Sequence, residues 1–296
     1  MNIVFIGCVE SSFVALKTLL AIHQVDVTGV VTLEKSAVNS DFCDITPLAR
    51  AQHIPVFYDG GKERSDELVS FIRYCKADYV FCIGWSRLLP TEVLQATKGG
   101  VVGYHPTLLP LHRGRHPIIW AIVNGLEETG SSLFLMDEGA DSGPLISQMH
   151  VAIEARETAA SLYQKLLTAL EAQLRDCVPK LAEGTLQPQP QDHSKATYWQ
   201  KRGKDDGQLH WEKSAVELDR LVRALSVPYP GAHFLYRGVD VVVKESSVAL
   251  EAAENGGPGQ VLAKKGDFFL VKCGQNALWI LPAIPIDVEI GGYLNG

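Results

Sequence analysis

The first part of the chain alternates short apolar runs with segments that repeat apolar residues at helical spacing. Residues 2–7 form an apolar run that ends in glycine, residues 13–22 are amphipathic, and residues 25–32 are apolar again. This order predicts a strand, a helix and a second strand, and therefore a βαβ unit with a parallel sheet. We expect Ser11 or Ser12 to cap the helix. The turn lacks two of the three glycines of the dinucleotide-binding fingerprint, so it does not favour NAD.

The same alternation continues to residue 178. Amphipathic segments predict helices at 46–53, 65–75, 91–96, 116–124 and 158–178. Apolar runs predict strands at 54–58, 78–84, 99–104, 131–136 and 145–151. The last helix should end before Pro179, because proline cannot donate the hydrogen bond of a helix interior. Together these elements predict an α/β fold, a Rossmann-like and mostly parallel sheet with helices on both faces.

The pattern changes at residues 184–195. The run 187–191 alternates glutamine and proline, which indicates a polar, extended linker. A helix at 214–225 and short strands separated by Gly and Pro follow, at 232–236, 239–244, 259–263, 268–272 and 278–281. They predict a small C-terminal β-barrel-like domain. We therefore expect a catalytic domain (1–186), a linker (187–197) and a small β domain with one leading helix (198–296).

Composition narrows the class of protein. The net charge of -7 argues against a broad nucleic-acid surface, although a local basic patch stays open. The six cysteines form no CxxC pair, so neither a zinc site nor a disulfide framework is indicated, and reduced thiols in a cytoplasmic protein are expected. No apolar run approaches the roughly 20 residues of a membrane helix, and no signal peptide is evident.

Candidate chemistry gathers around one histidine. His105 follows the apolar pair Val101-Val102, and Pro106 and Pro110 exclude a regular helix or central strand just after it. His105 should therefore stand at the carboxyl end of a strand, where open α/β sheets bind ligands. The loop 84–90 should reach the same rim from the preceding strand. The plain alternative is a hydrogen-bonded histidine in a turn.

A carboxylate on another loop suggests what this histidine does. The sheet could bring Asp141 beside His105, and a carboxylate paired with an imidazole makes it a better proton acceptor. No metal cluster and no nucleophile elbow is evident, so general acid–base chemistry is more natural than covalent hydrolysis. Read alone, Asp141 is more often a turn residue, and Asp137 and Glu138 fit a solvated acidic turn.

Basic and apolar residues flank this segment. Arg113 and Arg115, next to His112 and His116, suit an anionic substrate such as a phosphate or diphosphate. A solvated basic turn would explain them equally. Four leucines read either as plain core or as the walls of a flat apolar slot: Leu88, Leu89, Leu108 and Leu109.

These residues resemble the formyltransferase family that uses 10-formyltetrahydrofolate, which includes methionyl-tRNA, glycinamide ribonucleotide and nucleotide-sugar N-formyltransferases. The family signature is Asn-x-His-x-Ser-Leu-Leu-Pro, then Arg-Gly, then Asp-x-Gly-x-Asp-x-Gly. The matching residues are His105, Leu108, Leu109, Pro110, Arg113, Gly114, Asp137, Gly139, Asp141 and Gly143. The likeness covers most of the chain and includes residues 3–7, 128–130, 206–211, 229–232 and 259–261.

The resemblance implies the roles of particular residues. His105 and Asp141 would be catalytic, with 10-formyltetrahydrofolate as the formyl donor and no metal. The folate would contact Trp85, Arg87, Leu88, Leu89, Leu108, Leu109, Met136, Asp137, Glu138, Gly139 and Ala140. The acceptor would contact Glu10, Arg113, Arg115 and Tyr198.

Two positions depart from the family pattern. Thr107 replaces a serine and keeps the hydroxyl, whereas Gly103 replaces the asparagine thought to hold the formyl oxygen. Loss of such a donor typically costs about 10²–10³ in rate. A backbone N–H, a water, His116 or Asn124 would have to replace it. Otherwise the chain binds folate and acceptor but transfers slowly or not at all.

The expected acceptor is the amine of a nucleotide-linked amino sugar, as in surface-glycan or flagellar-glycan biosynthesis. The acidic total and residues 113–117 fit this substrate better than tRNA, which would call for a more basic face. Methionyl-tRNA and a small amino-acid amine remain alternatives. We expect neither a membrane nor a nucleic-acid partner, with tRNA as the exception, and a homodimer stays open.

Overall fold

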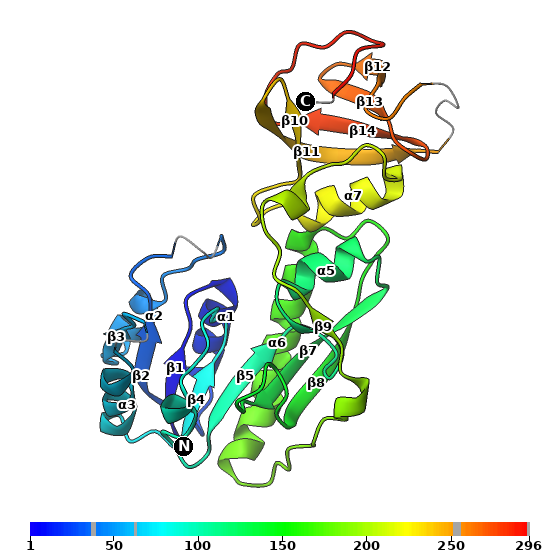
Figure 1. Cartoon of the computed structure of the whole chain (residues 1–296). Helices are drawn as coiled ribbons and strands as arrows, with labels where there is room; N and C mark the ends of the chain where they lie inside the picture. The colour runs from blue at the N-terminus through cyan, green and yellow to red at the C-terminus, as the bar shows by residue number, and fades with distance from the viewer. Residues whose placement is uncertain (37–39, 62–63, 251–255, 295–296) are drawn as a thin grey trace. The chain divides into compact units, whose positions relative to one another are not determined.

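The computed structural model describes residues 1–36, 40–61, 64–250 and 256–294. The chain forms two compact units. The first comprises Met1–Pro117, Glu128–Ala152 and Gln164–Trp199, and the second comprises Ile118–Glu127, Ile153–Tyr163 and Gln200–Gly296. Figure 1 shows the elements of both units along the chain.

The first unit is built on a seven-stranded sheet. Its strand order is β3-β2-β1-β4-β5-β7-β8. The strands are β1 (Asn2–Ile6), β2 (Asp26–Thr32), β3 (Val56–Tyr58), β4 (Tyr79–Cys82), β5 (Val101–His105), β7 (Glu128–Leu135) and β8 (Leu145–Ala152). The pairs from β3 to β5 are parallel, whereas β5-β7 and β7-β8 are antiparallel. The predicted mostly parallel sheet is confirmed, with an antiparallel edge.

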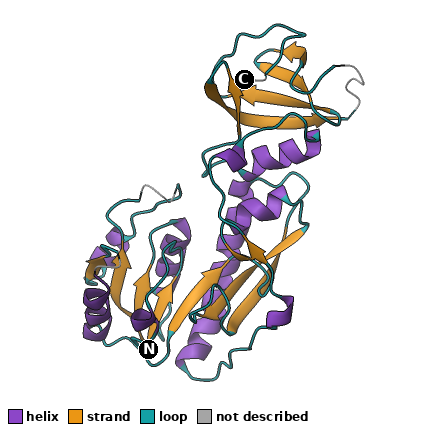
Figure 2. Ribbon diagram, in the orientation of Figure 1, coloured by secondary structure: helices purple, strands orange, loops and turns teal. Residues whose placement is uncertain are grey.

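Helices cover both faces of this sheet, as predicted (Figure 2). The helices of the first unit are α1 (Glu10–Leu19), α2 (Thr46–Ala51), α3 (Ser65–Tyr74), α4 (Thr91–Leu94) and most of α6 (Ala159–Ala182), whereas α5 (Pro117–Val123) falls, apart from its first residue, in the second unit. Alternate residues of β1 enter two different cores. Ile3 and Phe5 pack with Leu16 of α1, whereas Val4 and Ile6 pack with Ile72 of α3. This period-two alternation follows from strand geometry.

Two helix boundaries differ from the prediction. Helix α1 begins three residues earlier, with Val9 as its N-cap. Ser12 lies inside the first turn, where its buried hydroxyl accepts from the Val9 N–H and donates to the Ile83 carbonyl. Helix α6 passes through Pro179 and ends at Ala182. Pro179 lacks only its own N–H, so it removes one bond to the carbonyl four residues upstream, while the Glu183 N–H still donates to the Pro179 carbonyl. Gly184 (φ 69°) then reverses the chain.

The second unit contains an antiparallel sheet in the order β10-β11-β14-β13-β12. Its strands are β10 (His233–Tyr236), β11 (Val239–Ala249), β12 (Val261–Lys265), β13 (Phe268–Lys272) and β14 (Ala277–Pro282). Helix α7 (Ala215–Ala224) packs against β11 and β14. Two short 3-10 helices, η2 (His193–Lys195) and η3 (Asp205–Gly207), precede α7. Among the described residues, no helix combines the length and apolarity that crossing a membrane requires.

A capping box fixes the start of α7. The Ser214 hydroxyl accepts from the Glu217 N–H, and the Glu217 carboxylate accepts from the Ser214 N–H and hydroxyl. We expect Ser214→Ala to lower the free energy of unfolding of this unit by about 1 kcal/mol at neutral pH. Urea titration, with Ser247→Ala on β11 as a matched exposed control, measures the loss.

This loss should depend on pH. The hydrogen bond from the Ser214 hydroxyl, and then the one from its N–H, lower the pKa of the Glu217 carboxyl. The stabilisation is therefore present above the unfolded-state pKa of about 4.3 and is lost as pH falls through the lower folded value. The difference between the wild type and Ser214→Ala should shrink in acid, and a difference that grows there would contradict the assignment.

Candidate active site

His105 is the last residue of β5, and its ring is held inside the protein. The side chain is 7% exposed, and Nε2 lies 2.9 Å from the carbonyl oxygen of His112. A carbonyl only accepts hydrogen bonds, so Nε2 must carry the proton. In the neutral ring the lone pair is then on Nδ1. The proton-accepting atom of His105 is therefore Nδ1, which faces Asp141.

The structure brings Asp141 to this nitrogen. Its Oδ2 lies 3.6 Å from Nδ1 of His105 and accepts a 2.9 Å hydrogen bond from the Gly114 N–H. The sequence predicted a hydrogen bond between carboxylate and imidazole. The observed 3.6 Å is too long for a hydrogen bond and becomes an ion pair only when Nδ1 is protonated, while the His112 carbonyl fixes the tautomer. Catalytic contacts commonly tighten only when substrate binds.

A short pair of strands closes the site beside Asp141. Strand β6 (Arg113–Gly114) pairs in parallel with β9 (Tyr198–Trp199). Gly114 has φ +105°, and a Cβ there would lie 2.4 Å from the Trp199 carbonyl oxygen. Only glycine fits this position. The sequence suggested a loop at this point, because the partner strand lies some 85 residues downstream and no local pattern reveals it.

The predicted acceptor residues have different surroundings. Arg113 is 1% exposed and donates to the Tyr198 hydroxyl (3.0 Å) and to Oε1 of Gln191 (2.7 Å). A substrate phosphate could reach its guanidinium only by displacing these groups. Arg115 and Tyr198 are exposed, and Glu10 accepts a 3.0 Å hydrogen bond from Gln164. Arg115 and Tyr198 therefore remain the accessible candidates.

His112 is not a cationic group of a basic turn. Burial lowers its pKa, and the charge of His105 lowers it further. Its ring stacks on Trp199, with centroids 4.1 Å apart and planes 9° from parallel. The Thr197 hydroxyl lies 3.3 Å from its Nδ1 and accepts its backbone N–H at 2.8 Å. At neutral pH this part of the site is held by a neutral imidazole.

Three of the eleven predicted folate contacts share one apolar cluster. Trp85, Leu89 and Met136 pack against the core formed with Cys82 and Val101. Leu88 is 82% exposed, while Leu109 is buried. The remaining contacts include Arg87, paired with Asp59 at 2.6 Å, and Leu108, which packs over Gly130. The folate contacts therefore stay a prediction.

The loop after β7 is a turn held together by the carboxylate of one of its own residues, Asp137. The Asp137 carboxylate accepts from the Gly139 N–H at 3.0 Å and from the Ser142 hydroxyl at 2.5 Å. Glu138, Gly139 and Ala140 are exposed. Because the Gly139 N–H is bonded to Asp137, the exposed backbone of Glu138 and Ala140 is what this turn offers to a ligand.

The space beside Gly103 is filled. A Cβ on this residue would lie 2.7 Å from Cγ of Met136 and 2.9 Å from Cζ of Phe134. Phe134 is its partner in the strand pairing, and His105, two residues on, points to the same face. The volume that an asparagine side chain would need is therefore occupied by these two side chains.

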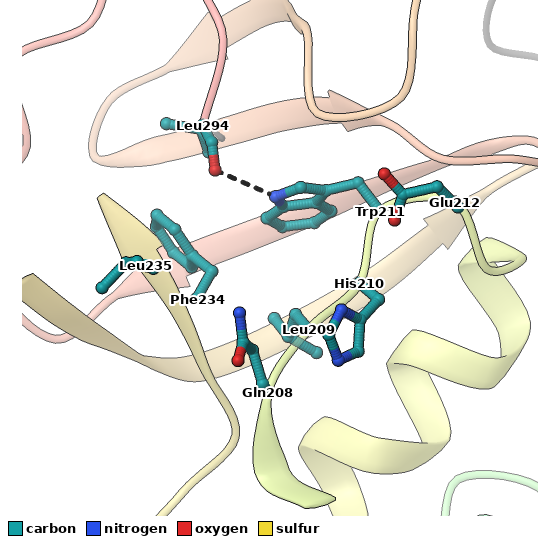
Figure 3. A pocket seen from close by; sticks show the side chains of 8 residues that line it. All are labelled: Gln208, Leu209, His210, Trp211, Glu212, Phe234, Leu235 and Leu294. Atoms are coloured by element: carbon teal, nitrogen blue, oxygen red, sulfur yellow. Dashed lines mark hydrogen bonds between the residues drawn. The ribbon is translucent and has the colours of Figure 1, made fainter. Parts of the chain in front are cut away.

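A cavity of about 280 Å³ lies in the second unit (Figure 3). Its floor includes Trp211, whose indole N–H donates to the Leu294 carbonyl at 3.1 Å, and Phe234. None of the residues predicted for the active site lines it. Within the described part of the chain, no cluster of three or more His, Cys, Asp or Glu side chains could hold a metal ion.

Comparison with known proteins identifies the family. Residues 1–177 match the model of formyl transferase, and residues 201–287 match that of the formyl transferase C-terminal domain. The chain belongs to the formyl transferase family. A methionyl-tRNA formyltransferase of Caldanaerobacter subterraneus subsp. tengcongensis is 33% identical over 285 residues, which is 95% of this chain and 91% of that protein. Formyl transferases of this family are folate-dependent and use 10-formyltetrahydrofolate, the donor predicted from the sequence.

Solved structures share the fold. The N-formyltransferase of Helicobacter canadensis, determined with folinic acid and dTDP-3-aminofucose, gives a TM-score of 0.70 at 19% identity, over 95% of this chain and 98% of its own. WlaRD, a sugar 3N-formyl transferase determined with dTDP and 5-N-formyl-THF, gives 0.69 at 15% identity, over 97% of this chain and 99% of its own. HypX of Aquifex aeolicus with tetrahydrofolic acid gives 0.66 at 21% identity. The match covers 95% of the present chain but only 43% of the HypX chain.

Proposed function

We infer that this protein transfers the formyl group of 10-formyltetrahydrofolate to the amine of a nucleotide-linked amino sugar, in the biosynthesis of a surface or flagellar glycan. The six cysteines are free thiols, which suits a cytoplasmic enzyme. Solved relatives determined with dTDP-3-aminofucose or dTDP support the nucleotide-sugar class.

The charge of the C-terminal region is the observation that favours a nucleotide sugar over tRNA as the acceptor. Residues 201–287, which match the C-terminal domain of the family, contain 11 Lys and Arg and 11 Asp and Glu. The whole chain has a net charge of -7. Binding a tRNA requires many contacts between basic side chains and phosphates. An electrically neutral domain suits a substrate with two phosphates better than a folded RNA.

The site residues support direct transfer to an amine. The amine would attack the formyl carbon, the bond from that carbon to the folate nitrogen would break, and the departing nitrogen would receive a proton with the help of His105 and Asp141. Nδ1 of His105 accepts the proton that the attacking amine releases, because Nε2 is already bonded to the His112 carbonyl. Asp141, 3.6 Å away, stabilises the resulting imidazolium. The exposed Arg115 is the candidate for the diphosphate.

A second candidate acceptor is methionyl-tRNA. The observation that favours it is the 33% identity to a methionyl-tRNA formyltransferase over nearly the whole chain. If tRNA is the acceptor, the affinity of the protein for tRNA should fall steeply as the salt concentration rises, because each contact with a phosphate releases counterions.

Mass spectrometry of formylated product tests the proposal. The protein is given 10-formyltetrahydrofolate with dTDP- and UDP-linked amino sugars in one series and with methionyl-initiator tRNA in another. We expect formylation in the sugar series and binding of the dTDP- or UDP-sugar in calorimetry. Formylation of the tRNA alone would replace the proposed acceptor by the second candidate. Product in neither series, with folate still bound, would identify a weakened relative in which Gly103 removed the activity.

A further inference from the structure

Asp141 occupies a backbone conformation that must be held in place. Its φ is 52°, in the left-handed region, which costs most L-residues roughly 1–2 kcal/mol and which aspartate enters more readily because its short side chain can hydrogen-bond locally. Such residues persist only where neighbouring groups fix them. The Gly114 N–H holds the carboxylate of Asp141 but does not hold its backbone. Another group must therefore secure the turn.

Gln191 supplies that group. Its side-chain amide nitrogen donates to the carbonyl oxygens of Asp141 (3.0 Å) and Gly143 (2.7 Å). These two carbonyls lie on either side of the reversal in the chain. Gln191 is 6% exposed, so water does not compete strongly for the same carbonyls. One buried amide thus closes the turn that presents the Asp141 carboxylate to His105.

A buried arginine orients this amide. Nη2 of Arg113 donates to Oε1 of Gln191 at 2.7 Å, which forces the NH₂ group of the amide toward the two carbonyls. Arg113 is itself held by the Tyr198 hydroxyl at 3.0 Å and contacts Nδ1 of His193 at 3.2 Å. Upstream of Gln191, the backbone of Gln189 exchanges two hydrogen bonds with Leu145, at 2.7 and 2.8 Å. The segment is therefore fixed at both ends.

We propose that Gln191, oriented by Arg113, is a positioning residue for formyl transfer that sets the place of the Asp141 carboxylate against Nδ1 of His105. This inference rests on the proposed function, in which Asp141 stabilises the His105 imidazolium. Gln191 touches neither folate nor acceptor in this role. Its loss should therefore lower kcat and leave the KM of both substrates unchanged.

Gln191→Glu is the sharpest variant. The carboxylate keeps the acceptor for Arg113 but loses both N–H donors, and it faces two carbonyls that repel it. Misplacing a catalytic group by about 1 Å can cost 10²-fold, so we expect kcat to fall about 10- to 100-fold. Gln189→Glu is the matched control in the same run, since this exposed side chain donates only to the Gln187 carbonyl. Gln191→Met repeats the test without a new charge if Gln191→Glu unfolds.

Two further readouts separate positioning from general stability. In an Asp141→Asn background, Gln191→Glu should cause no additional loss of kcat in single-turnover assays. Hydrogen exchange at the Gly114 amide, which is bonded to Asp141, should accelerate in Gln191→Glu and stay unchanged in Gln189→Glu. An unchanged kcat, or equal losses with and without Asp141, would overturn the positioning role. If Asp141→Asn alone transfers at the wild-type rate, the proposed function of Asp141 fails first, and the role of Gln191 falls with it.

Discussion

Replacing His105 with alanine is expected to lower kcat for formyl transfer by about 10²–10⁴-fold, the usual contribution of a general acid or base. Replacing Asp141 with asparagine should approach the same loss. Asparagine keeps an acceptor for the Gly114 N–H but cannot stabilise a charged His105, which lies 3.6 Å away. Steady-state kinetics with the acceptor identified by mass spectrometry measures both effects, and circular dichroism verifies folding.

The chain offers a matched control for this pair. His150 and Glu128 form another histidine–carboxylate contact, at 3.1 Å, but both side chains are more than half exposed. His150→Ala should leave kcat unchanged, because solvent competes with so exposed a pair. Near-wild-type turnover in His105→Ala or Asp141→Asn would remove the assignment of the catalytic residues.

Replacing Gly103 with asparagine should not raise the kcat of formyl transfer. The new side chain would press on Met136 and Phe134, whose atoms lie 2.7 and 2.9 Å from the position of its Cβ. Overpacking of this kind typically costs about 1–3 kcal/mol of stability. We expect Gly103→Asn to melt at a lower temperature than the wild type and to have no higher kcat. Thermal melts and steady-state kinetics measure the two quantities.

Gly103→Ala separates crowding from chemistry. It introduces the same Cβ without an amide, so the ratio of kcat between Gly103→Asn and Gly103→Ala reports the amide alone. The comparison is repeated with Met136→Ala, which removes the closest obstructing atom. A rise of orders of magnitude for asparagine in that background would mean that this chain has no native donor for the formyl oxygen.

The first sheet was predictable because its signals are local. Apolar runs and helical spacing placed nearly every strand and helix within a few residues, since burial on both faces makes β1 and β4 continuously apolar. The sequence predicted the ends of the helices less exactly than their positions. Ser12 is not the N-cap residue itself, but from within the first turn its hydroxyl accepts from the N–H of the N-cap Val9 and donates to the Ile83 carbonyl. Pro179 looked like a stop, but it lacks only its own N–H, and α6 continues past it.

The candidate site was predictable only in part. His105 and Asp141 could be paired only as residues of two loops that the sheet could bring together, because β7, which precedes Asp141, runs antiparallel to β5 and ends at the opposite edge from His105. Gln191 was missed because a run of glutamine and proline looks like a linker when its partners are unknown. The one available signal was Arg113, since a buried guanidinium needs acceptors. The role of His112 was also hidden, because its lowered pKa depends on burial that no local pattern shows.

The pairing of β6 with β9 has a consequence for synthesis of the protein. A nascent chain that has emerged as far as residue 177 already holds His105, Arg113 and Asp141, yet it lacks the amide and the strand that fix the Asp141 turn. Domains fold on the ribosome in the order in which they leave it. The catalytic geometry can therefore be completed only after Trp199 has cleared the exit tunnel, well after the central sheet has formed.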